Sequence, residues 1–292
     1  MPSTRDIRRR IKSVKNTAQI TKAMQMVAAS KMRKAQQAAI ASRPYASLMN
    51  NVLGNVTFHA RDFTHPLMEK REGPKRAVVL IATDKGLCGA LNSNLMREAA
   101  KFDKTNTIYI TAGRKAAQFV ARTRRSLAAE FTYKDAPLFS EARAISKFAR
   151  DLFLKGEVDR VDILFTNFIS TLTQKPQSRP FLPVGEIKPL SVGMDGQKAE
   201  EKLMHGSTEY LFEPSAEQVL AAMLPHSLNF EVYQFLLEAK ASEQSARMVA
   251  MKNATDNAQQ LIKDLTLEYN KMRQASITKE LLEISSAAMA LE

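Results

Sequence analysis

The sequence predicts an α/β fold in which both chain ends form a long antiparallel coiled coil beside a central Rossmann-like α/β domain with a mostly parallel sheet. All ten glycines lie between Gly54 and Gly206. Neither Gly nor Pro occurs from Ser3 to Arg43 or from His226 to Glu292, so each end is expected to be one long uninterrupted helix. Between these segments, short apolar runs alternate with helical patterns, as in parallel strands with covering helices.

The first segment carries an apolar stripe whose positions alternate steps of four and three residues. This 3.5-residue period is the signature of a left-handed coiled coil. The later positions are mostly Ala, so a partner helix is expected to approach closely. Pro44 removes one backbone donor, so we expect a kink or loosening between Ile40 and Pro44 before the helix continues toward Gly54. The stripe consists of Ile7, Ile11, Val14, Ala18, Thr21, Gln25, Ala28, Met32, Ala35 and Ala39.

The last segment repeats this pattern and then shifts its register. A first stripe ends at Ser276, and a displaced one begins at Ile277. Such a shift indicates that the helix leaves one partner and meets another surface. Because this segment is longer than the first, its end is expected to overhang as a single helix. The first stripe is Met248, Met251, Thr255, Ala258, Ile262, Leu265, Tyr269, Met272 and Ser276, and the second is Ile277, Leu281, Ile284, Ala288 and Leu291.

The middle of the chain is expected to hold the sheet. Residues Gln174 to Gly206 are rich in Pro and Gly, so we expect a loop or an irregular strand there. We divide the chain into an N-terminal coiled-coil helix (1–57), a central α/β domain (74–206) and a C-terminal coiled-coil helix (210–292). The expected strands are Arg76–Thr83, Thr107–Thr111 and Val161–Ser170, and the expected helices are Ala90–Phe102, Arg114–Arg124 and Ser140–Lys155.

Composition excludes several classes of protein. With 292 residues and 45% hydrophobic residues, the chain can build a sizeable core. No apolar stretch is long enough to span a membrane, and the start lacks the apolar stretch of a signal peptide. Cys88 is the single cysteine, so we expect no internal disulfide and infer a reducing compartment. The four histidines lack the spacing of metal ligands, so we expect no metal site.

The positive charge is concentrated at the start of the chain. The formal net charge is +13, and residues 1–34 hold ten Lys or Arg against the single acid Asp6. Such a helix is expected to face an anionic surface, which could be nucleic acid, acidic lipid headgroups or acidic protein loops. The alternative is a solvated helix face without a dedicated partner.

One loop stands where a phosphate-binding loop would stand. Residues 84–89 follow an expected strand and precede an expected helix, but neither dinucleotide nor P-loop spacing is present. We therefore expect a tight turn with a small buried thiol at Cys88. No nucleophile and base pair can be assembled, and Glu280 and Glu283 lie on a rod without a cleft. We expect no catalytic residue and no cofactor.

Several long segments resemble the gamma-subunit family of F-type ATP synthases. The resemblance runs in the family's order over nearly the whole chain. The segments are IRRRIKSVKNTAQITKAMQMVAASKMRKAQ (Ile7–Gln36), TDKGLCGALN (Thr83–Asn92), EYLFEPSAEQVLAAMLP (Glu209–Pro225), ASEQSARMVAMKNATDNAQQLIKDL (Ala241–Leu265) and YNKMRQASITKELLEI (Tyr269–Ile284).

This resemblance implies a mechanical role. In the family, the paired terminal helices stand inside a ring of three alpha and three beta subunits, and the globular part sits against epsilon and the membrane ring of c subunits. The subunit turns like a camshaft, holds no catalytic residue and binds no nucleotide.

The resemblance also implies partner contacts at particular positions. For Met24 and Gln274 the alternative is ordinary coiled-coil packing. The implied contacts are Met24 and Arg247 with the acidic and catch loops of beta, Gln274, Thr278, Glu280 and Glu283 with the alpha and beta head, and Tyr210 and Glu213 with the c ring.

Two other functions compete with the rotor. A basic coiled coil could bind nucleic acid, but the first aromatic residue of the basic helix is Tyr45, which leaves stacking recognition without support. A dinucleotide-dependent enzyme lacks the glycine fingerprint. With no presequence in view, the expected setting is the cytoplasmic face of a bacterial inner membrane, as a peripheral, single-copy member of a hetero-oligomer.

Overall fold

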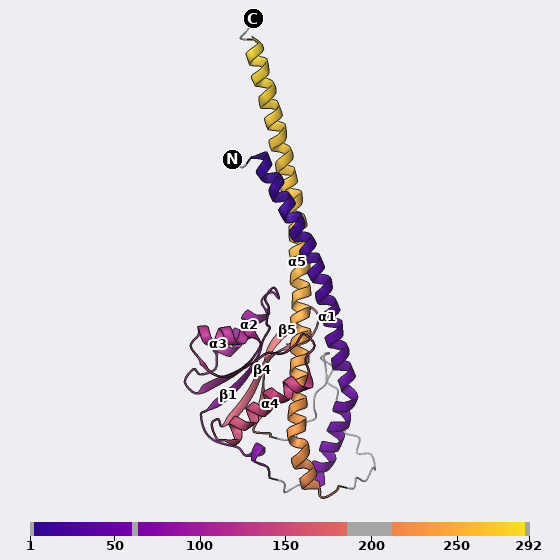
Figure 1. Ribbon diagram of the computed structural model, residues 1–292, viewed down its shortest axis with the longest axis vertical. Coiled ribbons are helices and arrows are strands. Elements are labelled where there is room, and N and C mark those ends of the chain that lie inside the picture. The colour runs from indigo at the N-terminus through magenta and orange to yellow at the C-terminus, as the bar shows by residue number, and fades with distance from the viewer. Residues whose placement is uncertain (1–2, 60–63, 186–211, 290–292) are drawn as a thin grey trace. The chain divides into compact units, whose positions relative to one another are not determined.

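The computed structural model describes residues 3–59, 64–185 and 212–289. The chain divides into two compact units. The helix-pair unit combines residues 1–27 with 248–292, and the α/β unit comprises residues 28–247. Helices α1 and α5 each contribute residues to both units (Figure 1). The elements are α1 (Thr4–His59), η1 (Pro66–Met68), β1 (Arg76–Ile81), α2 (Leu91–Ala100), β2 (Thr107–Ala112), α3 (Arg114–Arg122), β3 (Ser126–Phe131), α4 (Phe139–Leu154), β4 (Arg160–Phe168), β5 (Gln174–Leu182) and α5 (Ala216–Met289).

The α/β unit contains the predicted, mostly parallel sheet. Its five strands lie in the order β3-β2-β1-β4-β5. The pairs β1–β2, β1–β4 and β2–β3 are parallel, and β4–β5 is antiparallel. The chain moves outward from β1 to β3 and then returns to β4 on the other side of β1. The topological switch point therefore lies between β1 and β4.

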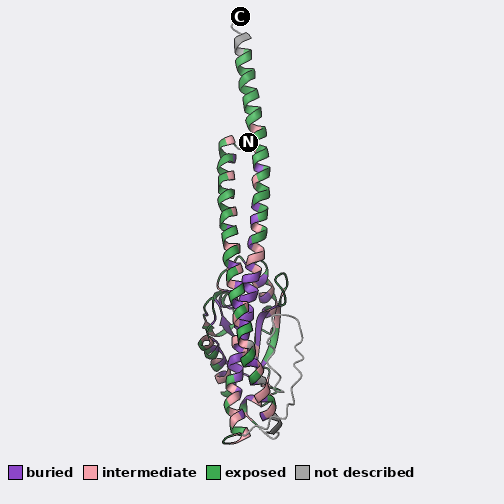
Figure 2. Ribbon diagram, turned by 90° about the vertical axis from the view of Figure 1, so that its right-hand side faces the viewer, coloured by how far each residue is buried: buried purple, intermediate pink, exposed green. Residues whose placement is uncertain are grey.

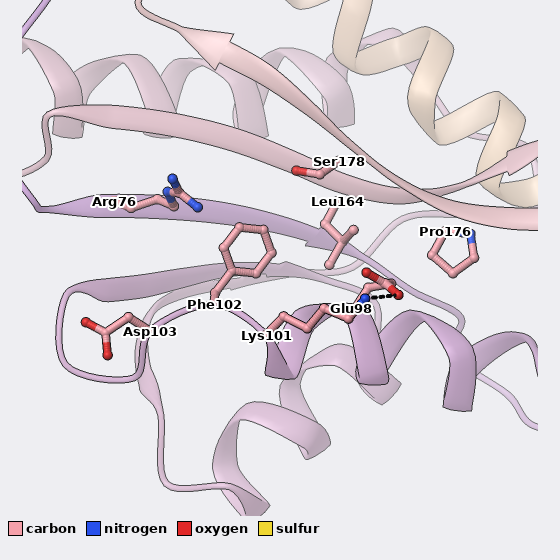
Figure 3. Close-up of a pocket in the computed structure, with 8 residues that line it drawn as sticks. All are labelled: Arg76, Glu98, Lys101, Phe102, Asp103, Leu164, Pro176 and Ser178. Carbon is pink, nitrogen blue, oxygen red and sulfur yellow. Dashed lines mark hydrogen bonds and ion pairs between the residues drawn. The ribbon is translucent and has the colours of Figure 1, made fainter.

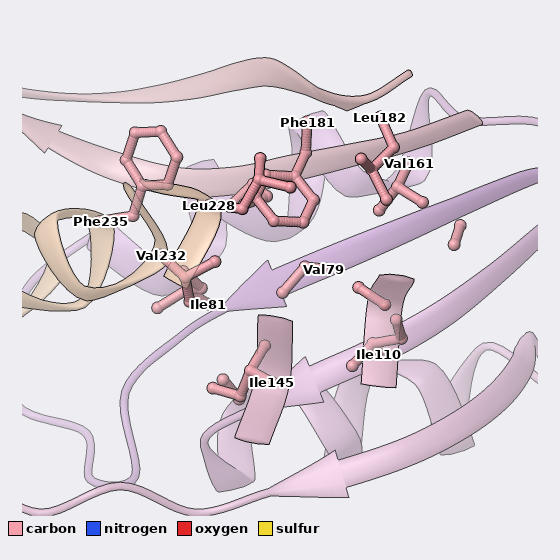
Figure 4. Packing of buried hydrophobic residues seen from close by; sticks show 14 of the residues in the cluster. Val79, Ile81, Ile110, Ile145, Val161, Phe181, Leu182, Leu228, Val232 and Phe235 are labelled. Carbon is pink, nitrogen blue, oxygen red and sulfur yellow. The ribbon is translucent and has the colours of Figure 1, made fainter. Parts of the chain in front are cut away.

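Two apolar layers cover the sheet. On one face α4 and α5 pack against inward residues of the strands, including Val79, Ile110 and Val161 (Figure 4). On the other face α2 and α3 pack against Leu80 and Tyr109. All five of these strand residues have at most 1% of their surface exposed. Strands buried on both faces explain why the sequence of β1 is a continuous apolar run.

The two edge strands of the sheet, β3 and β5, are not among the three strands that the sequence predicts. No strand is predicted for residues 126–131, yet β3 forms there as an edge strand whose residues are mostly exposed and whose apolar run is short, Leu127 to Ala129. Strand β5 forms over Gln174–Leu182, where the sequence predicts a loop or an irregular strand, and its pairing with β4 is irregular, with a register shift between Val161 and Asp162. Its Pro176 and Pro180 are tolerated because β5 is the opposite edge of the sheet.

The two long helices both continue through a proline. Helix α1 remains helical across Pro44 to His59, and α5 begins at Ala216, ahead of Pro225. A proline inside a helix costs about 3 kcal/mol or more. Burial next to Pro225 offsets that cost, since Leu224 and Leu228 are 1% and 4% exposed. In the described parts of the chain, no helix combines the length and hydropathy needed to cross a lipid bilayer.

Helix α5 carries two acidic residues with raised pKa values in the α/β unit, the half-buried Glu231 and the buried Glu238. Burial raises the pKa of Glu231 and of Glu238 to about 7, and the Arg179 guanidinium opposes the increase. Glu238 is 9% exposed. Because the folded state holds these protons more tightly than the unfolded state, the contribution of both groups to stability is greatest at low pH and falls as the pH rises through 7.

We expect Glu238→Gln to stabilise the protein at alkaline pH. At pH 8 the wild-type carboxyl must ionise inside the fold, so the substitution should raise the free energy of unfolding by about 2 to 3 kcal/mol. Below pH 4.5 the two proteins should be equally stable. Denaturant unfolding at both pH values measures this, with exposed Glu157→Gln as the matched control. An equal effect of Glu238→Gln at both pH values would contradict the prediction.

Candidate functional site: the helix pair and the base of α5

The helix-pair unit is an antiparallel pair with a buried seam (Figure 1). The buried residues are those of the predicted stripes. On α1, Ile7 and Thr21 are 3% and 9% exposed, and on α5, Met251 and Thr255 are both 5% exposed. Further along α5, Ala258 and Leu265 are 8% and 6% exposed. The predicted 3.5-residue stripe is therefore the seam of this unit.

One polar contact crosses the seam. The hydroxyls of Thr21 and Thr255 are 2.7 Å apart and buried. Each hydroxyl also lies near a carbonyl of its own helix, Thr21 at 3.1 Å from Ala18 and Thr255 at 2.9 Å from Met251. Because a hydroxyl has one proton, one threonine donates across the seam while the other donates to its own helix. Because a hydroxyl pair meets only when the two threonines are opposite each other, this contact fixes the register of the two helices in a way that Ala contacts cannot.

The end of α5 lies beyond the seam. Every residue from Arg273 to Ser286 is exposed (Figure 2). The first three positions of the displaced stripe, Ile277, Leu281 and Ile284, fall in this stretch and are exposed by 48%, 62% and 67%. The exposure of Ala288 and Leu291 lies outside what the structure describes. The predicted overhang as a single helix is thus present. Exposed apolar residues along a bare helix are typical of a surface that a partner covers.

The basic face of α1 is exposed. In the described chain none of its basic residues up to Lys22 makes an ion pair, and Asp6 is engaged by Ser3, whose hydroxyl donates to it at 2.7 Å. Ile20, Met26 and Val27 are apolar and 54 to 61% exposed on the same helix. Positive charge with interspersed apolar groups suits an acidic protein surface. The exposed basic residues are Arg5, Arg8, Arg9, Arg10, Lys12, Lys15 and Lys22.

The contact residues implied by the resemblance fall into separate groups. Met24 is half-buried beside the seam, and Gln274, Thr278, Glu280 and Glu283 share the exposed end of α5 in the same unit. Within that end, Thr278 donates to the Gln274 carbonyl at 2.9 Å and Lys279 pairs with Glu283 at 3.6 Å. In the α/β unit, Arg247 is 9% exposed and Glu213 is exposed. Tyr210 lies outside the described residues.

Arg247 contacts the loop of residues 84–89, which stands where a phosphate-binding loop would stand. Its Nη2 donates to the carbonyls of Lys85 and Gly86 at 3.4 and 3.2 Å, and to Glu243 Oε1 at 2.8 Å. Cys88 is 2% exposed, as predicted, and burial raises the pKa of its thiol. The loop is therefore a turn held by the chain's own guanidinium.

The sequence analysis did not predict an ionic cluster around Lys240 and Glu243 of α5. Lys240 Nζ lies 3.0 Å from Glu243 Oε2 and 3.4 Å from Asp135 Oδ1, and Asp135 also pairs with Lys31 at 2.5 Å. Lys240 and Glu243 are 2% and 3% exposed. The spacing of Lys240, Glu243 and Arg247 was a possible signal, because opposite charges three and four residues apart meet on a helix. Such a pattern usually marks a solvated face, so burial could not be predicted from it.

A surface cavity on the α2 side of the sheet offers no separate site. It has a volume of about 280 Å³ and lies between α2 and strands β1, β4 and β5 (Figure 3). Its charged groups already have partners within the chain: Lys101 pairs with Glu98 at 2.8 Å, and Arg76 with Asp162 at 3.1 Å. Across the described residues, no cluster of His, Cys, Asp or Glu is suited to a metal ion.

Comparison with known proteins decides the family. The sequence matches the ATP synthase family over residues 3–291. It is 49% identical to the ATP synthase gamma chain of Opitutus terrae, with 99% of each chain covered. It is 47% identical to the gamma chain of Methylacidiphilum infernorum over the full length of both. The chain belongs to the ATP synthase gamma chain family.

Solved structures agree with this assignment at the level of the fold. The chain resembles a chain of the Tetrahymena thermophila mitochondrial ATP synthase central stalk and c ring, with a TM-score of 0.59, 25% identity, and coverage of 80% of this chain and 99% of that one. A chain of the Euglena gracilis mitochondrial ATP synthase gives a TM-score of 0.65 at 19% identity, with 99% and 94% covered.

We expect the threonine pair to contribute measurably to the helix pair. Thr21→Val and Thr255→Val each leave one hydroxyl without its cross-seam partner, whereas the double variant removes both hydroxyls and keeps the volume. A double-mutant cycle on thermal unfolding should give a coupling energy of about 1 kcal/mol. Exposed Thr278→Val, whose hydroxyl bonds only within α5, is the control. Strictly additive effects of the two seam substitutions would show that the hydroxyls do not interact.

Proposed function

We propose that this gamma chain is the central-stalk rotor of a proton-translocating F-type ATP synthase. It carries rotation between the membrane c ring and the catalytic head of alpha and beta subunits. The observation that carries the proposal is the full-length family match together with a helix pair whose longer member ends in a bare, partly apolar stretch. The comparisons support this function and give no support to the nucleic-acid alternative.

The rotor is a non-catalytic member of the complex. Its partners are the alpha, beta, epsilon and c-ring subunits, and the exposed basic face of α1 suits the acidic loops of beta. We infer from the family resemblance that the chain binds no nucleotide of its own. Arg247 donates to the carbonyls of Lys85 and Gly86 in the turn after β1. The chain associates with the membrane through the complex, and we place it at the cytoplasmic face of a bacterial inner membrane.

The individual contacts form part of the same proposal. Met24 and Arg247 are assigned to the acidic and catch loops of beta. The exposed position of the α5 end supports its contact with the head, and the exposed side chain of Glu213 supports contact with the c ring. Tyr210 is assigned to the c ring on the resemblance of its segment alone. The residues assigned to the head are Gln274, Thr278, Glu280 and Glu283.

A reversible crosslink tests whether the helix pair turns. Lys22 is exposed on α1, so Lys22→Cys can be joined to a cysteine engineered into an acidic loop of beta in the assembled complex. If the chain turns, the disulfide should abolish multi-turnover ATP hydrolysis, leave nucleotide binding to the head intact, and release the block on reduction.

The controls separate blocked rotation from damage. The Lys22→Cys complex without the beta cysteine should hydrolyse ATP normally under the same oxidation, and buried Cys88 should not react. Full hydrolysis with the crosslink essentially complete would show a static scaffold and overturn the proposal.

A further inference from the structure

Helix α5 passes the place where an open α/β sheet normally binds its ligand. Such ligands sit beyond the carboxyl ends of the strands, at the switch point of the topology. In this chain the switch point lies between β1 and β4, and the adjoining segments are residues 82–90 after β1 and 169–173 after β4. Side chains of α5 reach both segments.

Three α5 side chains donate hydrogen bonds to backbone carbonyls around this switch point. Thr166 lies on β4, Thr171 lies in the loop that follows β4, and Gly86 lies in the loop that follows β1. The bonds run from Ser242 Oγ to the Thr166 carbonyl (3.0 Å), from Ser245 Oγ to the Thr171 carbonyl (2.8 Å) and from Arg247 Nη2 to the Gly86 carbonyl (3.2 Å).

Charged groups extend the contact to the segment after β3. Lys240 Nζ pairs with Asp135 and lies 4.8 Å from the centre of the Tyr133 ring, and Tyr133 donates to the Ala82 carbonyl at 2.9 Å. Glu243 pairs with both Lys240 and Arg247, at 3.0 and 2.8 Å. Both buried cations therefore have a carboxylate partner, as a buried charge requires.

These directional bonds resist rotation of α5 about its own axis more strongly than the apolar core does. Apolar packing is non-directional, so it opposes separation of α5 from the sheet more strongly than small rotations about the helix axis. Hydrogen bonds weaken steeply when their geometry is bent, so several of them with acceptors on different segments resist rotation as well.

We propose that these five α5 residues, Lys240, Ser242, Glu243, Ser245 and Arg247, form a polar collar through which torque passes between the sheet and α5. The inference rests on the proposed function, because torque has meaning only if the chain turns. In open α/β sheets that bind a ligand, the ligand lies at the switch point. In this chain the polar side chains of α5 lie there instead.

The torsional stiffness of the joint is the quantity to measure. A gold rod is attached to a cysteine at Leu127, which is 42% exposed on the edge strand β3, in the complete complex immobilised through its beta subunits. With the head halted by removal of nucleotide, the variance of the rod's angle reports the stiffness between the head and the sheet. Ser242→Ala combined with Ser245→Ala should increase this variance, and Asp135→Asn, at a more exposed position, should increase it less.

The control removes the same kind of bond elsewhere. Tyr109→Phe deletes a buried hydroxyl that donates to the Ala99 carbonyl at 2.8 Å inside the α/β unit, without touching α5. Its variance should equal that of the wild type. The Ala variants favour helix at both positions, so α5 should form in them.

Two results would overturn the collar. Unchanged variance in both the double variant and Asp135→Asn, in complexes whose rods turn when ATP is added, would refute the collar alone. Rods that never turn with the wild-type chain would refute the rotor function and the collar with it.

Discussion

The α/β unit depends on the burial of α5 on all sides between Gln234 and Ser245. Every residue from Gln234 to Ser245 is buried. On one side the sheet and α4 cover the helix, and on the other side α1 brings Ala35 and Ala39 against Leu237 and Ala241. A helix normally exposes one face to water. Here complete enclosure makes this stretch of a long helix part of the core of the α/β unit, so the sheet cannot complete its core without it.

Enclosure also explains the contrast between two sets of charges. Inside, Lys240 and Arg247 are paired with Glu243, because a buried cation without a partner is strongly destabilising. On α1, the basic residues up to Lys22 are in water and have no ion-pair partner in the described chain. The first set forms ion pairs inside the α/β unit. The second set is available to attract acidic partners, and its effect is expected to weaken as salt increases.

Sequence periodicity predicted the regular parts well. The seam residues Ile7, Thr21 and Thr255 were identified because a 3.5-residue apolar stripe that continues over many helical turns indicates a coiled coil. Strands β1, β2 and β4 were predicted because they are buried on both faces. Strand β3 was missed because this exposed edge strand has only a short apolar run, and α5 continues through Pro225 because tertiary packing around Leu224 and Leu228 outweighs the effect of that proline.

The candidate site was less predictable from sequence. The bare end of α5 was expected because the second helical segment is longer than the first, and the register shift after Ser276 indicated that this end meets a different partner. The polar collar was not expected, because its acceptors are backbone carbonyls of segments far away in the sequence, such as Thr166 and Gly86. A carbonyl is the same in every residue, so only the fold can show which one a side chain meets.

The central claim is that this chain turns inside its complex. The most direct test is to watch a probe on the edge strand β3 while the immobilised head hydrolyses ATP. We predict continuous rotation in one direction that stops when ATP is removed. A probe that stays at one angle while the same molecules hydrolyse ATP at full rate would contradict the claim.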